Sequence, residues 1–300
     1  MNVLRTLVYP LVVILSTAVA ASAGPSLKKT TLSKLGLPSS GTVFTLMGLN
    51  LSHKDNMPEK FKGVFSRPPY KIVMVDYPAS FDTNSIPDGV KLLDTLLKAT
   101  PGKKIVMGHS QGAQVASRWM REHADDPAAP RPGELTFLLS GNPLRSDGGG
   151  DIVGRTEVGG TIGVATPTDT PWHIVDVARR YDGWADRPAD ADNSIAEWNA
   201  TVGKFSLHMK YSEVNLNDPD HTIWTKANTT YVLTQEETLP MWQWSPNVPA
   251  EVVSVMKAHV ESAYRRPPND PPVKPLPVTS RYWQMRLKNW GVANESTRRR

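Results

Sequence analysis

Residues of three kinds in this chain could together cleave an ester: a serine on a glycine-rich turn, a carboxylate and a histidine. Ser110 lies in the segment GHSQG (residues 108–112), which fits the pattern GxSxG. Glycine at both flanks permits a tight turn that exposes the serine hydroxyl, because side chains there would meet neighbouring backbone. The pattern predicts a nucleophilic serine, although a serine that only caps the next helix would also fit it.

A nucleophilic serine needs a general base and an orienting carboxylate, in the order Ser, Asp or Glu, His when the serine ends a strand of a parallel sheet. Asp182, in the segment YDGWAD, directly follows a predicted strand and is the expected acid. Asp186, one turn later, is the alternative acid. His208 follows a helix-like segment and is the expected base, whereas His221 beside an Asp-Pro turn is the second candidate.

Two further features are expected around Ser110. His109 should support the turn, because a neighbouring side chain points away from the serine hydroxyl. The N–H of Gln111, at a helix start, is expected to face a developing oxyanion. A second donor should come from Gly48 or Leu49 in the loop after the first strand, between which the sequence does not decide. A Gly48 that only relieves a tight turn is equally consistent.

The elements that must position these residues alternate along the chain. Helix-like segments at 86–98, with Ser85 as a possible N-cap, and at 111–123 lie between apolar, β-branched runs. This alternation predicts a mostly parallel α/β sheet with helices on both faces and the site at the carboxyl ends of the strands. The predicted strands are Thr42–Met47, Lys71–Val75, Lys104–Met107, Leu135–Ser140 and Ile174–Arg179.

Two later segments complete the predicted domain. The segment 222–234 is expected to be a hairpin that turns at Ala227-Asn228, at the edge of the sheet or on its rim. Residues 147–170, rich in Gly, Thr and Asp, are expected to form a loop over the site.

Composition restricts the partners and cofactors. The net charge of +5 comes from the C-terminal end, where residues 265–300 hold nine Lys or Arg against two Asp or Glu. The preceding residues are slightly acidic, so nucleic-acid binding by the folded domain has little electrostatic support. The chain has no cysteine, no HExxH pattern and no phosphate-binding loop. No metal or nucleotide cofactor is therefore expected.

The amino-acid composition at both ends of the chain differs from that of the central part. Residues 1–23 have Arg5, an apolar run from Leu7 to Ala20 and small residues up to Ala23, as in a secretory signal, with an uncleaved membrane anchor as the alternative. Six prolines between Pro267 and Pro277 predict an extended linker, followed by a basic, aromatic-rich tail to residue 300. A catalytic domain is expected over 24–266, outside the cytoplasm, with the tail at a membrane surface or solvated.

Several segments together resemble the PE-PPE domain, a cutinase-like serine hydrolase domain of mycobacteria and relatives. They are GHSQG at 108–112, GNPLR at 141–145 with DGG at 147–149, YDGWAD at 181–186, Asn199-Ala with Gly203 and His208, and NTTY at 228–231. The resemblance covers roughly residues 42 to 245. It implies an α/β-hydrolase triad of Ser110, an Asp in the YDGWAD segment, and His208.

The layout, a leader in place of an N-terminal PE or PPE domain, is similar to the membrane-associated cutinase-like hydrolase (Chp) acyltransferases. That resemblance implies an extracytoplasmic enzyme that moves fatty acyl groups between trehalose-type glycolipids. A plain lipid or ester hydrolase with water as acceptor remains an alternative, because the same acyl-enzyme serves both reactions. A non-catalytic binding module is the third hypothesis, and it would be favoured if Ser110 and His208 were not within hydrogen-bond distance of each other.

Overall fold

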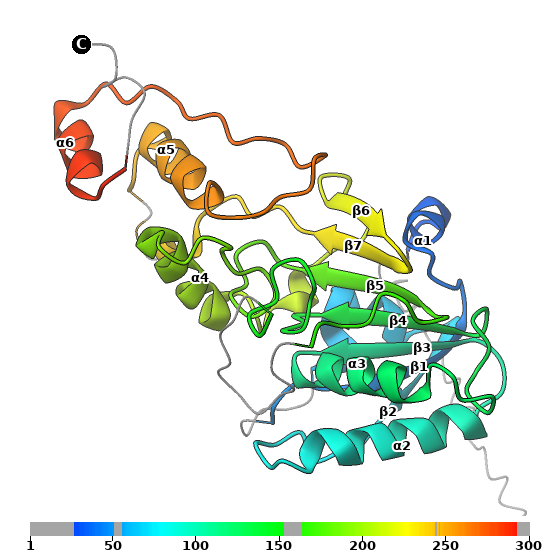
Figure 1. The fold of residues 1–300 in the computed structure, drawn as a ribbon. Coiled ribbons are helices and arrows are strands. Elements are labelled where there is room, and N and C mark those ends of the chain that lie inside the picture. Colours follow the sequence, from blue (N-terminus) through cyan, green and yellow to red (C-terminus); the bar gives the residue numbers. More distant parts are fainter. Residues whose placement is uncertain (1–26, 51–55, 153–163, 244, 246, 293–300) are drawn as a thin grey trace, which may run out of the picture.

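The computed structural model describes residues 27–50, 56–152, 164–243, 245 and 247–292. Within them a seven-stranded sheet has the order β2-β1-β3-β4-β5-β7-β6, and all neighbouring strands are parallel except β6 and β7 (Figure 1). This is an α/β-hydrolase fold, as the sequence predicts. The strands are β1 (Gly41–Leu46), β2 (Tyr70–Met74), β3 (Lys104–His109), β4 (Leu135–Ser140), β5 (His173–Ala178), β6 (Thr222–Lys226) and β7 (Thr229–Leu233).

Each predicted strand is present to within one or two residues at its ends. The hairpin is also confirmed: β6 and β7 form it, and Ala227 has the positive φ of 51° that its tight turn needs. β6 forms one edge of the sheet. β3 and β4 are buried along their whole length, as expected for central strands covered on both faces.

Helices cover both faces of the sheet. α2 (Ser85–Ala99) and α3 (Gln111–His123) pack on one face, where Val106 and Phe137 join their core. α1 (Lys29–Leu35) and the 3₁₀ segment η1 (Met57–Ser66) lie on the other, with Ile105 and Leu138. The alternation of Ile105 and Val106 follows from the two-residue period of a strand.

The structure corrects one expectation about α2. Ser85 is not its N-cap, because the helix already includes Ser85 and the residue at the cap position is Asn84. The Ser85 hydroxyl instead donates to Oε1 of Gln111 at 3.1 Å. The serine therefore connects the start of α2 to the start of α3 beside Ser110.

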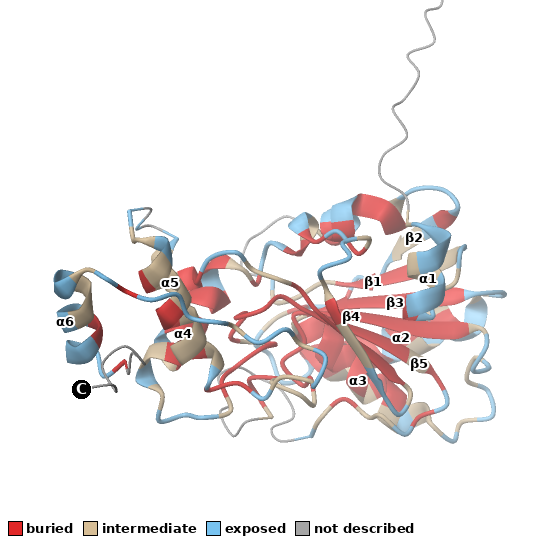
Figure 2. Cartoon of the chain, turned by 90° about the horizontal axis from the view of Figure 1, so that it is seen from above, coloured by how far each residue is buried: buried red, intermediate tan, exposed pale blue. Residues whose placement is uncertain are grey.

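A helical layer lies beyond the carboxyl ends of the strands (Figures 1 and 2). It contains α4 (Ser194–Ser206), the short 3₁₀ turn η3 (Pro240–Trp242), α5 (Ala250–Glu261) and α6 (Arg281–Asn289). Its core is separate from the two sheet cores and includes Ala196 of α4, Val252 of α5 and Leu287 of α6. This layer forms one wall of the site described below.

The C-terminal segment differs from the expected linker and tail. Val278 and Leu287 are buried against α5, at 1% and 0% exposure. Asp270 accepts hydrogen bonds from Arg180 and from Thr222 of β6. The segment after Pro267 is therefore attached to the domain at a few points, through these buried apolar side chains and the contacts of Asp270, while most of its described residues are exposed.

No helix among the described residues is both long and apolar enough to cross a membrane. The predicted leader, residues 1–23, lies outside the described residues, as does the part of the expected site loop between 153 and 163.

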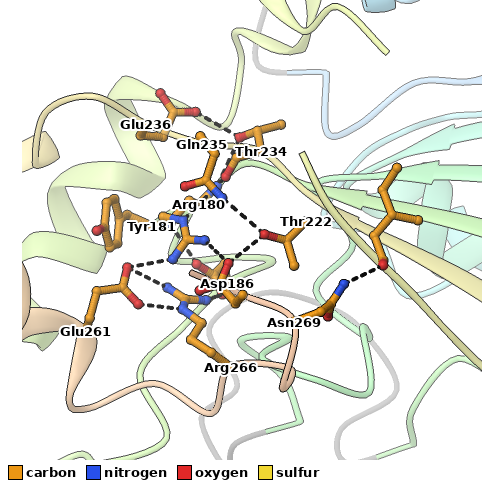
Figure 3. A network of polar contacts seen from close by, with 12 residues as sticks. Arg180, Tyr181, Asp186, Thr222, Thr234, Gln235, Glu236, Glu261, Arg266 and Asn269 are labelled. Atoms are coloured by element: carbon orange, nitrogen blue, oxygen red, sulfur yellow. Dashed lines mark hydrogen bonds and ion pairs between the residues drawn. The ribbon is translucent and has the colours of Figure 1, made fainter. Parts of the chain in front are cut away.

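A buried ionic network fixes the C-terminal segment to the sheet (Figure 3). Glu261, at the end of α5, pairs with Arg180 at 2.9 Å and with Arg266 at 2.6 Å. Arg266 also donates to Asp186 at 2.6 Å. Burial alone would raise the pKa of Glu261, but the two arginines outweigh burial and hold that pKa at about 2.

We expect this network to make the free energy of unfolding depend on pH in the acidic range. Since the pKa of Glu261 is lowered on folding from 4.5 to about 2, its contribution is complete above pH 4.5 and is lost as the pH falls towards 2. Glu261→Gln should lower the free energy of unfolding at neutral pH by about 3 kcal/mol. The difference from the wild type, measured by denaturant titration, should shrink below pH 4.5. Glu237→Gln, at an exposed carboxylate, is the control, and a pH-independent difference for Glu261→Gln would contradict the assignment.

Candidate active site

Ser110 lies on the turn between β3 and α3, at the carboxyl end of a central strand. Its backbone has φ 53° and ψ −119°, a strained conformation for a residue with a side chain. A Cβ on Gly108 would lie 2.7 Å from the carbonyl oxygen of Gly112, and one on Gly112 would lie 2.1 Å from that of Leu46. Both flanking glycines are therefore required sterically, as the GxSxG pattern predicts.

His208 follows α4 and reaches Ser110 across the site. Its Nε2 lies 2.9 Å from Ser110 Oγ, and the ring is buried at 6% exposure. On its other side, Nδ1 lies 2.9 Å from Oδ2 of Asp182. A carboxylate only accepts hydrogen bonds, so Nδ1 carries the proton and Nε2 is free to accept from the serine hydroxyl.

Asp182 lies just after β5 and is completely buried. Besides His208, its carboxylate accepts a hydrogen bond from the Tyr211 hydroxyl at 2.9 Å and from the backbone N–H of Trp184 at 3.1 Å. These donors stabilise a negative charge that burial would otherwise disfavour.

Tyr211 is a site residue that the sequence analysis missed. It begins the 3₁₀ turn η2 (Tyr211–Glu213), and its oxygen also accepts from the N–H of Arg179 at 2.9 Å. Burial and the Asp182 charge raise the pKa of Tyr211 well above its usual value, so the hydroxyl stays a donor. Its position three residues after His208 was the only available signal, and a tyrosine there is equally consistent with a core residue.

Asp186, the alternative acid, belongs to a different group of contacts (Figure 3). It accepts from the N–H of Tyr181 at 2.8 Å and pairs with Arg266 at 2.6 Å. Both of its oxygens are thus engaged in holding the acid loop and the C-terminal segment. The structure brings Asp182, not Asp186, to His208.

Of the other histidines that the structure describes, neither His221 nor His109 is placed as the base of Ser110. Nε2 of His221, the second candidate, lies 3.0 Å from the carbonyl of Asn215 near the sheet edge. His109 is buried behind the turn, with Nδ1 3.1 Å from Ser140 Oγ and its ring against that of His208. Burial and the nearby Lys60 charge lower the pKa of His109 well below its usual value, so its ring is neutral.

Glycine makes room for the two adjacent imidazoles, whose planes are tilted by 35°. Gly141 has φ 54°, and a Cβ there would lie 2.8 Å from both the His109 and His208 rings. The segment 141–145 is fixed by its own Arg145, which donates to Asp176 of β5 at 3.0 Å and lies over the ring of Tyr231. The GNPLR segment thus keeps space for the histidine and fixes the loop after β4.

The loop after β1 approaches Ser110 closely. A Cβ on Gly48 would lie 3.0 Å from the Ser110 Cβ, so a larger residue would crowd the serine. Leu49 lines the cavity in front of it. Gln111 is the first residue of α3, and its N–H has no acceptor within the helix. The candidate oxyanion donors, Gln111 and either Gly48 or Leu49, thus line the same cavity as the serine, and the Gln111 side chain is hydrogen-bonded to Ser80 and Ser85.

A cavity of about 370 Å³ opens above Ser110. One part of its wall is apolar and includes exposed side chains at the mouth, Phe81 and Phe205, at 60% and 81% exposure. The polar part includes Gln114, which donates to Asp151 at 2.9 Å. The apolar lining residues among those described are Met47, Leu49, Phe81, Pro143, Trp184, Phe205 and Met209.

Within the described residues, one group of side chains has the spacing of metal ligands: Asp94, His123 and Asp126, at the opposite end of α3 from the serine turn. The ammonium of Lys98 lies 2.9 Å from Asp94 and 3.0 Å from Asp126. Lys98 thus pairs with both carboxylates, and His123 Nε2 lies 3.2 Å from Asp94, so the cluster is a partly exposed ion-pair group.

Comparison with known proteins gives consistent matches. The PE-PPE domain model matches residues 60–265. Esterase PE16 of Mycobacterium tuberculosis is 34% identical over 53% of this chain and 33% of its own length. From the same organism, SL1278 acyltransferase Chp1 is 28% identical over 49% of this chain and 38% of its own, and diacyltrehalose acyltransferase Chp2 is 26% identical over 62% and 57%.

The chain thus spans between a third and somewhat over half of the length of these relatives. The family model, by contrast, covers more than half of the chain and includes the serine turn, the acid loop and His208. On that match, the chain belongs to the PE-PPE domain family.

Proposed function

We propose that the protein is an extracytoplasmic serine esterase or acyltransferase that forms an acyl-enzyme on Ser110. The observation that carries this proposal is the continuous hydrogen-bonded series Ser110–His208–Asp182 below an apolar cavity. Its distances of 2.9 Å at both steps favour catalysis over a non-catalytic binding module, for which a misaligned serine and histidine would be expected.

The reaction would begin when Ser110 Oγ attacks the ester carbonyl carbon while its proton passes to His208 Nε2. The negative oxygen of the tetrahedral intermediate would accept hydrogen bonds from the N–H of Gln111 and from Gly48 or Leu49. The bond to the leaving alcohol then breaks, and that oxygen takes the proton from His208. Asp182 keeps the imidazole oriented and stabilises its positive charge.

The second half of the reaction releases the acyl group. An acceptor hydroxyl gives its proton to His208 and attacks the acyl carbonyl, and the proton returns to Ser110 as the new ester leaves. With a sugar hydroxyl the result is acyl transfer, and with water it is hydrolysis. The apolar wall formed by Met47, Phe81, Phe205 and Met209 suits a fatty acyl chain.

The acyltransferase reading, with glycolipids of the trehalose type as donor and acceptor, is supported by the similarity to diacyltrehalose acyltransferase Chp2. The esterase reading is supported by the similarity to Esterase PE16. Export by the N-terminal segment is part of the same proposal, because a glycolipid substrate of the cell envelope lies outside the cytoplasm.

The nucleophile is tested with a fluorophosphonate probe and a soluble short-chain ester. Ser110→Ala should abolish both labelling and hydrolysis, because it removes the attacking oxygen. His208→Ala should be nearly as damaging, since base and nucleophile act as one unit. His221→Ala is the matched control and should keep its activity. Undiminished labelling of Ser110→Ala would overturn the proposal.

The acid is tested by comparing two isosteric changes. Asp182→Asn should lower kcat by a factor on the order of 10⁴, because the amide no longer fixes the productive tautomer of His208. Asp186→Asn should mainly lower the melting temperature, since it weakens the ion pair with Arg266. Activity and thermal unfolding are measured on both variants; a greater kcat loss for Asp186→Asn at equal stability would transfer the role.

Acyl transfer and ester hydrolysis are distinguished by their products. Purified protein is incubated with an acylated trehalose lipid, with and without a second glycolipid acceptor, and the products are identified by mass. We expect a glycolipid that has gained one acyl group when the acceptor is present. Free fatty acid alone under both conditions would assign the protein to the hydrolases.

A further inference from the structure

Helix α4 exposes its two aromatic residues, whereas its two charged residues are largely buried. Trp198 and Phe205 are 61% and 81% exposed, whereas Lys204 is only 6% exposed. Glu197 points towards the protein, where it accepts from Arg187 at 2.9 Å. A helix on a water-facing surface normally has the opposite arrangement, with charges outward. The exposed side of α4 is therefore unlike a surface adapted to water.

Helical geometry places Trp198 and Phe205 on one line. Residues seven apart lie on the same side of a helix, about 10 Å from each other along its axis. Ser194 and Thr201, at the intervening helical spacing, complete a stripe without a charged residue. We call Ser194, Trp198, Thr201 and Phe205 the α4 stripe.

The α4 stripe joins two hollows. Phe205 lines the mouth of the cavity above Ser110. Trp198 lines a second, shallower hollow of about 510 Å³, whose other residues are Ser194, Ile195, Met241, Trp242, Met256 and Trp290. The stripe therefore leads from an aromatic hollow at one end of α4 to the reactive serine at the other.

Helix α6 adds positive charge beside the second hollow. Arg281, Arg286 and Lys288 lie on α6, and the following Trp290 lines the hollow that Trp198 also lines. Tyr282 and Met285 are 55% and 59% exposed. Exposed aromatic side chains interleaved with cations suit the boundary between anionic headgroups and acyl chains.

We propose that the α4 stripe and α6 together dock on an anionic lipid surface and hold the Ser110 cavity against it. The inference rests on the proposed function for its purpose, since a fatty acyl chain could then enter past Phe205 without crossing water. A second copy of the chain is a poorer partner. It would offer the same uncharged stripe and the same basic helix, and so no negative group for α6.

The absence of cysteine from the sequence permits a direct test. Trp198→Cys is made in the full chain, in a Ser110→Ala background that leaves the lipid unchanged, and is labelled with an environment-sensitive fluorophore. The matched control is Leu92→Cys on α2, an exposed apolar position away from α4 and α6. Vesicles of phosphatidylcholine with or without phosphatidylglycerol are the probe.

We expect the label at position 198 to shift to shorter wavelength and brighten about twofold or more on phosphatidylglycerol vesicles, as it leaves water. The label at position 92 should not respond. Adding Arg286→Gln should raise the lipid concentration for half of the change about fivefold, because one cation near the surface is lost.

Equal responses at positions 198 and 92, or none at 198, would overturn the docking proposal. So would a response at 198 that follows protein concentration without vesicles, which would indicate contact between copies. Hydrolysis of a soluble short-chain ester by the chain with Ser110 intact is measured in parallel. If no hydrolysis is detected, the proposed function is refuted but the docking proposal is not, because the fluorophore reports contact with lipid whether or not the site is active.

Discussion

The candidate site depends on one buried negative charge. The Asp182 carboxylate is fully buried, and its hydrogen bonds come from the ring of His208, the hydroxyl of Tyr211 and the N–H of Trp184. Losing any of these donors would leave part of a charge unpaired in a medium of low dielectric. The position of the acid therefore constrains the loop after β5 and the segment after α4 together.

Close packing of backbone enforces this constraint. A Cβ on Gly203 of α4 would lie 1.9 Å from the carbonyl oxygen of Tyr181, and one on Gly183 would lie 2.3 Å from that of Ala200. Helix and acid loop thus touch directly, without intervening side chains. Since His208 follows the same helix, this contact sets the distance between Asp182 and His208, and hence the reach of the imidazole to Ser110.

The central sheet and the serine turn could be predicted because both follow from local patterns. The apolar runs at 104–107 and 135–140 indicate strands, and the glycines around Ser110 indicate a tight turn, without information from distant residues. The order of acid and base along the chain likewise pointed to Asp182 and His208. The sequence favoured Asp182 but left Asp186 open, because the ion pair that engages Asp186 comes from Arg266, eighty residues further along the chain.

The helical layer was the least predictable part for the same reason. The prolines from Pro267 to Pro277 predict an extended linker, but nothing local shows that Asp270 pairs with Arg180 or that Leu287 enters a core. Contacts of this kind join residues far apart in the chain. The exposure of Trp198 was equally hidden, since the sequence of α4 alone suits a helix with either side facing the protein.

The extended segment after α5 also protects the sheet. β6 is an edge strand, and the side-chain amide of Asn269 donates to its Ile223 carbonyl while Asp270 accepts from its Thr222 hydroxyl. An uncovered edge offers free backbone groups to the strands of other molecules and is a common origin of aggregation. A protein that lacks the residues after Pro267 would therefore be at risk of self-association through β6. The segment covers this edge strand and so disfavours aggregation there.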